Sequence, residues 1–312
     1  MMKIVLHIGA HRTASTSFQA YLRRNARELR ARRVGFWGPR RMRPYRNMLP
    51  KASASGPFTS EASAGDHVAR QLDLAERRGI ELLFLSDAEI CGSVQENIRC
   101  AALYPNVGPQ VEALARMFSG RLSSVVLTPR SLDQYWCSAA AQAVLQGAPV
   151  PERDTLSQIA RSSRSWRDVI ADVAKAMPDA TLNVLPFEAF RSQSPAYFAA
   201  ATGLAAPRCR EPSWLNPSPT LPELRRVLAE RDAPATVLPF GMGRWNPFTN
   251  EEHAIMREAY ADDMMWLSSG ADGFATLTEG CRPDRAGSTL PQAAQKKGQM
   301  DEFGHKQVAR PG

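Results

Sequence analysis

An apolar run near the start of the chain constrains the fold most strongly. Residues 4–8 read Ile-Val-Leu-His-Ile, a composition typical of a central parallel strand that is covered on both faces. The run breaks at Gly9, which permits a sharp turn, and the hydroxyl residues 15–17 offer a cap for a following helix. Because backbone N–H groups at a helix start attract anions, the sequence predicts a strand, a phosphate-binding loop and a helix.

Three further segments have the composition of buried strands and alternate with stretches of helical periodicity. These segments span residues 80–85, 123–128 and 182–185. We therefore predict an α/β fold, with a central parallel sheet flanked by helices and a helix-rich C-terminal portion. In this interpretation residues 1–281 form one domain, and residues 282–312, which lack apolar anchors, form a disordered tail.

Other stretches carry weaker signals. Residues 34–49 contain glycines, prolines and several arginines, which favour a loop over a regular element. That loop could hold an anionic acceptor or guard the cofactor, and it could equally cover an edge of the sheet. The Ser-, Ala- and Gly-rich residues 52–65 predict an exposed connection, and residues 154–176 predict a single helix.

The net charge of +8 favours anionic partners. Nucleic acid, phosphorylated cofactors, acidic glycans and membrane surfaces all meet this condition, so charge does not choose among them. The five cysteines lack CxxC spacing, which indicates neither a disulfide framework nor a zinc site and favours a reducing, cytoplasmic location. No apolar run reaches the roughly 18 residues of a membrane-spanning helix, and we expect no export signal.

The loop after the first strand reads His11-Arg12-Thr13-Ala14-Ser15-Thr16. A Walker A loop aligned on Gly9 requires glycine at position 14 and lysine at position 15, and both requirements fail. The missing lysine argues against an ATPase or a kinase. A second basic residue, Arg130, follows the strand at 123–128, and Ser138 lies about two turns into the next predicted helix. A guanidinium and a hydroxyl so placed suit a second phosphate.

Together these features resemble the sulfotransferase family, whose 5′-phosphosulfate loop follows a strand and contains a basic residue, Ser or Thr, Gly and Thr-Thr. Family members also carry an Arg at a strand end and a Ser one short helix later, as at Arg130 and Ser138. Residues 182–188, Leu-Asn-Val-Leu-Pro-Phe-Glu, are similar to the family's strand that ends in an aromatic-Glu pair. Later stretches, including residues 243–248, are closer to bacterial sulfotransferase-like proteins in general character.

The resemblance implies the family's P-loop NTPase-like fold and an enzyme that uses 3′-phosphoadenosine 5′-phosphosulfate as donor. Its sulfuryl group would pass to a hydroxyl or amine of a glycan, a lipid or another small molecule, without a metal ion. Arg12 would stabilise the leaving 5′-phosphate, which the loop residues 11–16 would hold. Arg130 and Ser138 would bind the 3′-phosphate, and Phe187 would lie near the adenine.

A general base must accept the proton of the acceptor, and the resemblance implies a His or a Glu at a neighbouring strand end. We expect Glu89 in this role, with Asp87 and His11 as the alternatives. Two positions depart from the family's pattern: Arg12 replaces the usual lysine, and Ala14 replaces the usual glycine. Arginine keeps the charge but has a different reach, and alanine restricts the backbone where a positive φ is needed.

Two other functions fit the same residues. A non-catalytic nucleotide-binding protein could retain the donor fold. A nucleic-acid-binding protein would use the positive charge, although the arginines form no known nucleic-acid-reading motif, so we expect no nucleic acid as partner. Each candidate also has a structural interpretation: residues 12–16 as an ordinary helix cap, Arg130 in a surface salt bridge, and Glu89 as the cap of a following helix.

Overall fold

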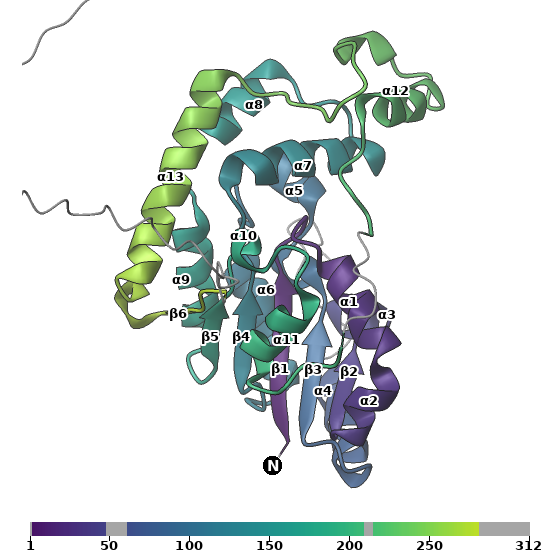
Figure 1. Cartoon of the computed structure of the whole chain (residues 1–312), viewed down its shortest axis with the longest axis vertical. Helices are drawn as coiled ribbons and strands as arrows, with labels where there is room; N and C mark the ends of the chain where they lie inside the picture. The colour runs from purple at the N-terminus through teal and green to yellow at the C-terminus, as the bar shows by residue number, and fades with distance from the viewer. Residues whose placement is uncertain (1, 48–60, 209–214, 281–312) are drawn as a thin grey trace, which may run out of the picture. The chain divides into compact units, whose positions relative to one another are not determined.

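The structure, a computed structural model, describes residues 2–47, 61–208 and 215–280. Its centre is a parallel sheet with the strand order β2-β3-β1-β4-β5-β6 (Figure 1). The strands are β1 (Lys3–Gly9), β2 (Val34–Trp37), β3 (Leu82–Ser86), β4 (Ser124–Leu127), β5 (Thr181–Val184) and β6 (Thr276–Leu277). In the register of the sheet, Val5 of β1 lies opposite Phe84 of β3 and Ser124 of β4. The predicted α/β class with a central parallel sheet is confirmed.

Helices connect the strands and flank the sheet (Figure 1). The α-helices are α1 (Ser15–Arg24), α2 (Ala26–Ala31), α3 (Pro39–Arg46), α4 (Glu61–Arg77), α5 (Val94–Arg99), α6 (Val107–Met117), α7 (Leu132–Leu145), α8 (Arg153–Ala160), α9 (Trp166–Ala176), α10 (Phe187–Phe190), α11 (Ser194–Thr202), α12 (Leu221–Ala229) and α13 (Asn250–Ser268). The 3₁₀ helices are η1 (Ala88–Cys91), η2 (Ala235–Val237) and η3 (Ala271–Gly273). After β5 the described chain is mainly helical, as predicted.

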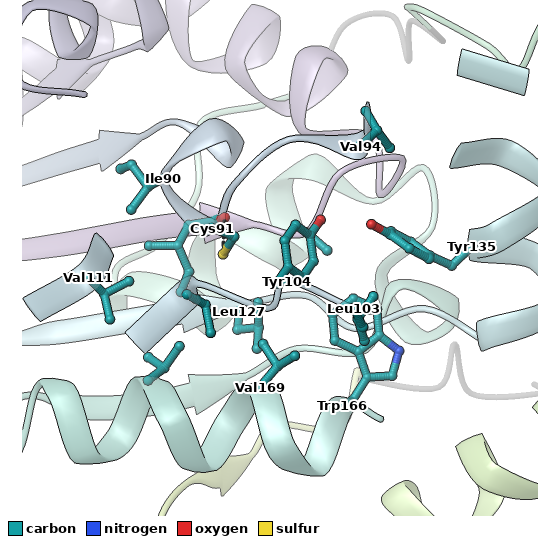
Figure 2. Packing of buried hydrophobic residues seen from close by; sticks show 14 of the residues in the cluster. Ile90, Cys91, Val94, Leu103, Tyr104, Val111, Leu127, Tyr135, Trp166 and Val169 are labelled. Atoms are coloured by element: carbon teal, nitrogen blue, oxygen red, sulfur yellow. Dashed lines mark hydrogen bonds between the residues drawn. The ribbon is translucent and has the colours of Figure 1, made fainter. Parts of the chain in front are cut away.

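Strand β1 is buried on both faces, which explains its apolar sequence. Ile4, Leu6 and Ile8 belong to a cluster with buried residues of α4, α6 and α9. Val5 belongs to a second cluster, with α1, α2 and α11. Figure 2 shows part of the first cluster, where Tyr104 and Tyr135 turn their hydroxyl groups toward one another. The sheet is therefore a rigid platform for whatever lies at its strand ends.

The prediction that residues 34–49 form a loop is wrong for most of this range, and residues 48 and 49 lie outside the described residues. Residues 34–37 form the edge strand β2, which pairs with β3, and residues 39–46 form α3. Pro39 stands in the first turn of α3, where its missing N–H is not needed. Trp37 stacks on Tyr45 with ring centroids 6.3 Å apart, which ties the strand to the helix. Pairing and packing outweigh the local glycine and proline signals here.

The single helix expected over residues 154–176 is divided into α8 and α9, because a capping box of Ser165 and Asp168 starts a new helix. Of the predicted connection 52–65, residues 61–65 belong to α4 and the rest lies outside the described residues. The predicted tail from residue 282 also lies outside them. No helix in the part of the chain that the structure describes has both the length and the apolar character that a membrane crossing requires.

Candidate functional site

A cavity of about 960 Å³ lies at the carboxyl end of the sheet, and its lining includes residues within three positions after the ends of β1, β3, β4 and β5. In open α/β sheets this edge is where ligands bind. The residues predicted from the sequence line this cavity with the exception of Thr13: His11, Arg12, Ala14, Ser15, Thr16, Glu89, Arg130, Ser138 and Phe187. The fold thus brings together residues that are far apart in the chain.

The loop between β1 and α1 takes its shape from left-handed backbone at Arg12 and Ala14, each with φ of 62°. The hydroxyls of Thr13 and Ser15 donate to the carbonyl oxygen of Ala10 at 2.8 and 3.2 Å, which tightens the loop. The predicted hydroxyl cap is wrong, because α1 is preceded by Ala14 and has no side-chain cap. Residues 14–16 line the cavity, so the uncapped start of α1 suits an anion.

Arg12 extends from the loop to α7 and to the segment before α12. Its Nε donates to Ser138 Oγ at 2.9 Å, and its Nη1 donates to Gln142 Oε1 at 2.9 Å. Its Nη2 donates to the carbonyl oxygen of Asn216 at 3.2 Å and to Ser218 Oγ at 3.4 Å. All four acceptors are neutral, so these contacts satisfy the hydrogen-bond donors of the guanidinium but do not balance its charge.

Arg12 belongs to a group of arginines that act on one another. Burial lowers the pKa of Arg12 to about 10, and the charges of Arg130 and Arg244 act in the same direction. Burial also lowers the pKa of Arg130, which the charge of Glu188 opposes. Arg130 donates from Nη1 to the backbone carbonyl of Arg12 at 2.8 Å. Positive charges that are partly buried near each other, as those of Arg12 and Arg130 are, favour an anionic ligand.

Phe187, predicted to lie near an adenine, begins α10 beside Arg130, whose guanidinium carbon is 5.0 Å from the ring centroid. A second cavity, of about 1090 Å³, is lined by Thr13 and the residues of α1, α2 and α11 that face it. Ala14, Ser15 and Phe187 line both cavities. The loop and Phe187 therefore form a wall shared by a cationic cavity and a second cavity beside it.

Glu89 lies in η1, and His11 holds it by a contact of 3.3 Å between Nε2 and Oε1. On its other side, His11 Nδ1 lies 2.9 Å from the hydroxyl of Tyr104, and the two rings stack. The hydrogen bond from His11 lowers the pKa of Glu89, helped by the charges of His11 and Arg46 and opposed by burial. Glu89 is therefore an ionised carboxylate at neutral pH, as a proton acceptor must be.

Asp87, an alternative general base, is almost fully buried and has both oxygens occupied. Arg46 donates to Oδ2 at 2.8 Å, and the backbone N–H of Glu89 donates to Oδ1 at 3.2 Å. Burial raises the pKa of Asp87, and Arg46 opposes that shift. In this arrangement Asp87 positions Glu89 and α3.

Several residues of the site were missed from the sequence. Gln142 lies one turn after Ser138 on α7, and this spacing could have identified it. Tyr104 carries no comparable local signal, because only the fold brings its segment to the loop. Ser218 and Arg244 stand in stretches noted for a general similarity to bacterial sulfotransferase-like proteins, but the sequence assigned them no role in the site. Arg12 thus contacts more residues of the site than its sequence motif predicts.

Comparisons with protein-family models, with curated proteins and with solved structures found no match to this chain. Within residues 2–47, 61–208 and 215–280, no group of three or more His, Cys, Asp or Glu side chains is arranged to hold a metal ion. The chemistry that the described site offers is that of clustered guanidinium groups beside an ionised carboxylate.

Proposed function

We propose that this protein is a sulfotransferase whose donor is 3′-phosphoadenosine 5′-phosphosulfate. The observation that carries the proposal is the group formed by Arg12, Arg130 and Arg244 at the uncapped start of α1. A donor with phosphate groups at both the 3′ and the 5′ position needs two neighbouring cationic sites. Arg12 and Arg130 supply two cationic side chains, and Arg130 donates a hydrogen bond to the backbone carbonyl of Arg12.

The donor would place its 5′-phosphosulfate at the loop, beside Arg12 and the first N–H groups of α1. Its 3′-phosphate would lie at Arg130 and Ser138, and its adenine beside Phe187. Phosphate oxygens would then replace some of the neutral acceptors of Arg12. Charge-assisted hydrogen bonds are roughly twice as strong as neutral ones, so the exchange favours binding.

The transfer itself requires alignment and charge stabilisation. The acceptor oxygen forms a bond to sulfur while the bond from sulfur to the bridging oxygen of the donor breaks. Glu89 takes the proton of the acceptor, and the electron pair of the broken bond stays on the 5′-phosphate, where Arg12 stabilises it. By analogy with phosphoryl transfer, positioned cations and N–H dipoles supply most of the rate enhancement.

Thermal unfolding with adenosine 3′,5′-bisphosphate and with ATP tests the donor site. We expect preferential stabilisation by the bisphosphate, of about 2.7 kcal/mol at a concentration 100 times its Kd. The R130A variant should lose this stabilisation, whereas R99A, which removes an exposed arginine from α5, should keep it. An equal response to both ligands, or no response to either, would overturn the proposal.

Turnover requires a separate measurement with labelled donor. E89Q should lower kcat by about 10² to 10⁴, the range typical of lost general-base catalysis, while the Kd of the bisphosphate stays unchanged. A protein that binds the bisphosphate tightly but transfers no label to any acceptor, in wild type as in E89Q, would instead be a non-catalytic binder.

A further inference from the structure

The cavity contains a second pair of arginines, on α3, that the donor does not use. Arg43 and Arg46 both line the cavity. They are three positions apart on one helix, a spacing that places side chains on the same face. The neighbouring Met42 and Tyr45 are buried in the core instead. Helix α3 therefore presents a cationic face to the cavity and an apolar face to the protein.

The α3 pair is distinct from the donor group in its electrostatic surroundings. The charges that act on Arg12 come from Arg130 and Arg244. Arg46, in contrast, acts on Asp87 and Glu89. The cavity thus contains one cationic group around Arg12 and a second one beside the carboxylate that we expect to receive the proton.

The ion pair of Arg46 with Asp87 fixes the position of α3. The Asp87 side chain is only 2% exposed, and it also accepts the backbone N–H of Glu89, so α3 and η1 are held to one another. Arg43 is exposed, and among the described residues it makes no ion pair. Arg43 lines the same cavity as Glu89 and has no carboxylate partner among the described residues, so its charge is available to an anionic group on the acceptor.

We propose, building on the sulfotransferase function above, that the acceptor is anionic and that Arg43 binds its carboxylate or phosphate group while the accepting hydroxyl lies at Glu89. Glu89 repels a negatively charged acceptor, and Arg43 compensates for that repulsion. The reaction is unchanged: the hydroxyl oxygen bonds to sulfur, the donor's bridging bond breaks, and Glu89 takes the proton. The anionic group of the acceptor takes no part in the bonds made or broken.

The test uses the full chain saturated with adenosine 3′,5′-bisphosphate and measures the affinity of matched probes by calorimetry. The first pair is 4-nitrophenyl glucuronide and 4-nitrophenyl glucoside, which differ in one carboxylate. The second pair is glucose 6-phosphate and glucose, which differ in one phosphate. We expect the anionic member of at least one pair to bind at least tenfold more tightly than its neutral partner.

R43A should abolish this preference. R40A is the matched control, because Arg40 is an exposed arginine of the same helix that does not line the cavity. Both variants should bind the bisphosphate like the wild type. If the bisphosphate binds but neither anionic probe is preferred, the anionic acceptor is ruled out and the donor site stands. If R43A keeps the preference, or if R40A removes it as R43A does, the assignment of the anion to Arg43 is overturned. If the bisphosphate itself does not bind, both proposals fail.

Discussion

Arg12 shows how a single residue can have its hydrogen-bond donors satisfied while its positive charge stays unbalanced. Its guanidinium donates to neutral oxygens of Ser138, Gln142 and the 216–218 segment. It also lies within the influence of two further arginines. The described residues give the Arg12 guanidinium neutral hydrogen-bond acceptors but no negative charge. Because its charge is not balanced, the guanidinium favours an anion over water.

Glu89 is the residue whose ionisation we expect to be most directly testable. Its pKa is lowered first by the hydrogen bond from His11, so H11A should move the pKa of Glu89 upward. The contact adds to the free energy of unfolding at pH values above the ordinary pKa of a glutamate. This contribution is lost as the pH falls through the lowered pKa of Glu89. A ¹³C titration of the Glu89 carboxyl measures the shift. Glu223, whose pKa is lowered by contacts with Thr220, serves as an internal reference that should not move.

At the scale of elements, the start of α9 links α13 to the candidate site through a series of hydrogen bonds. Asp263 of α13 accepts hydrogen bonds from Ser165 Oγ at 2.5 Å, from the Trp166 N–H at 2.9 Å and from the Arg167 N–H at 3.2 Å. Trp166 in turn donates from its ring N–H to the backbone carbonyl of Arg130 at 2.8 Å. The position of Arg130, which we propose binds a phosphate group, thus depends on α9, a helix that does not line the cavity.

The substitution D263A should lower the free energy of unfolding by about 2 to 3 kcal/mol, because it leaves the buried Trp166 N–H at the start of α9 without its acceptor and removes the acceptor of the Ser165 hydroxyl. D262A removes an exposed carboxylate from the next position and should change stability by less than about 0.5 kcal/mol. Urea denaturation of both variants measures the difference. Similar losses in the two would show that the contacts of Asp263 contribute little.

Elements also show what the sequence can and cannot predict. β1, β3 and β4 were predictable because strands buried on both faces are almost entirely apolar. β2 and α3 were missed because their glycines and prolines indicate a loop. Pairing with β3 makes β2 regular, and the packing of Tyr45 against Trp37 links α3 to β2. In the site, spacing along the chain identified Arg130 and Ser138. The partners of Arg12 near residue 216 have no such signal, since that contact exists only in three dimensions.

At the scale of the whole molecule, the central strand carries a buried titratable group that couples stability to pH. His7 points to the side of the sheet where Phe18 and Tyr197 pack around its ring, and Ser86 Oγ lies 2.8 Å from Nδ1. Burial lowers the pKa of His7 to about 4. The folded protein therefore holds this imidazole neutral under conditions in which the unfolded chain would protonate it.

Stability should consequently fall as pH drops from about 6.5 toward about 4, where the unfolded state binds more protons. The contribution of His7 amounts to roughly 3 kcal/mol over this interval, at about 1.4 kcal/mol per pH unit. The profile of H7Q should lack this component, whereas H67Q, at an exposed position of α4, should follow the wild type. Urea denaturation at pH 7 and pH 4.5 measures the difference, and parallel profiles for H7Q and the wild type would contradict it.

The contact between Arg12 and Asn216 joins positions that are 204 residues apart. A ribosome that adds roughly 5 to 20 residues per second needs about 10 to 40 seconds to make that stretch of chain. During this interval the nascent protein has its loop but lacks two of the four acceptors of the Arg12 guanidinium, the Asn216 carbonyl and the Ser218 hydroxyl. The full set of Arg12 contacts therefore forms only after most of the chain has been synthesised, and the nucleotide binding that we propose for this loop would follow it.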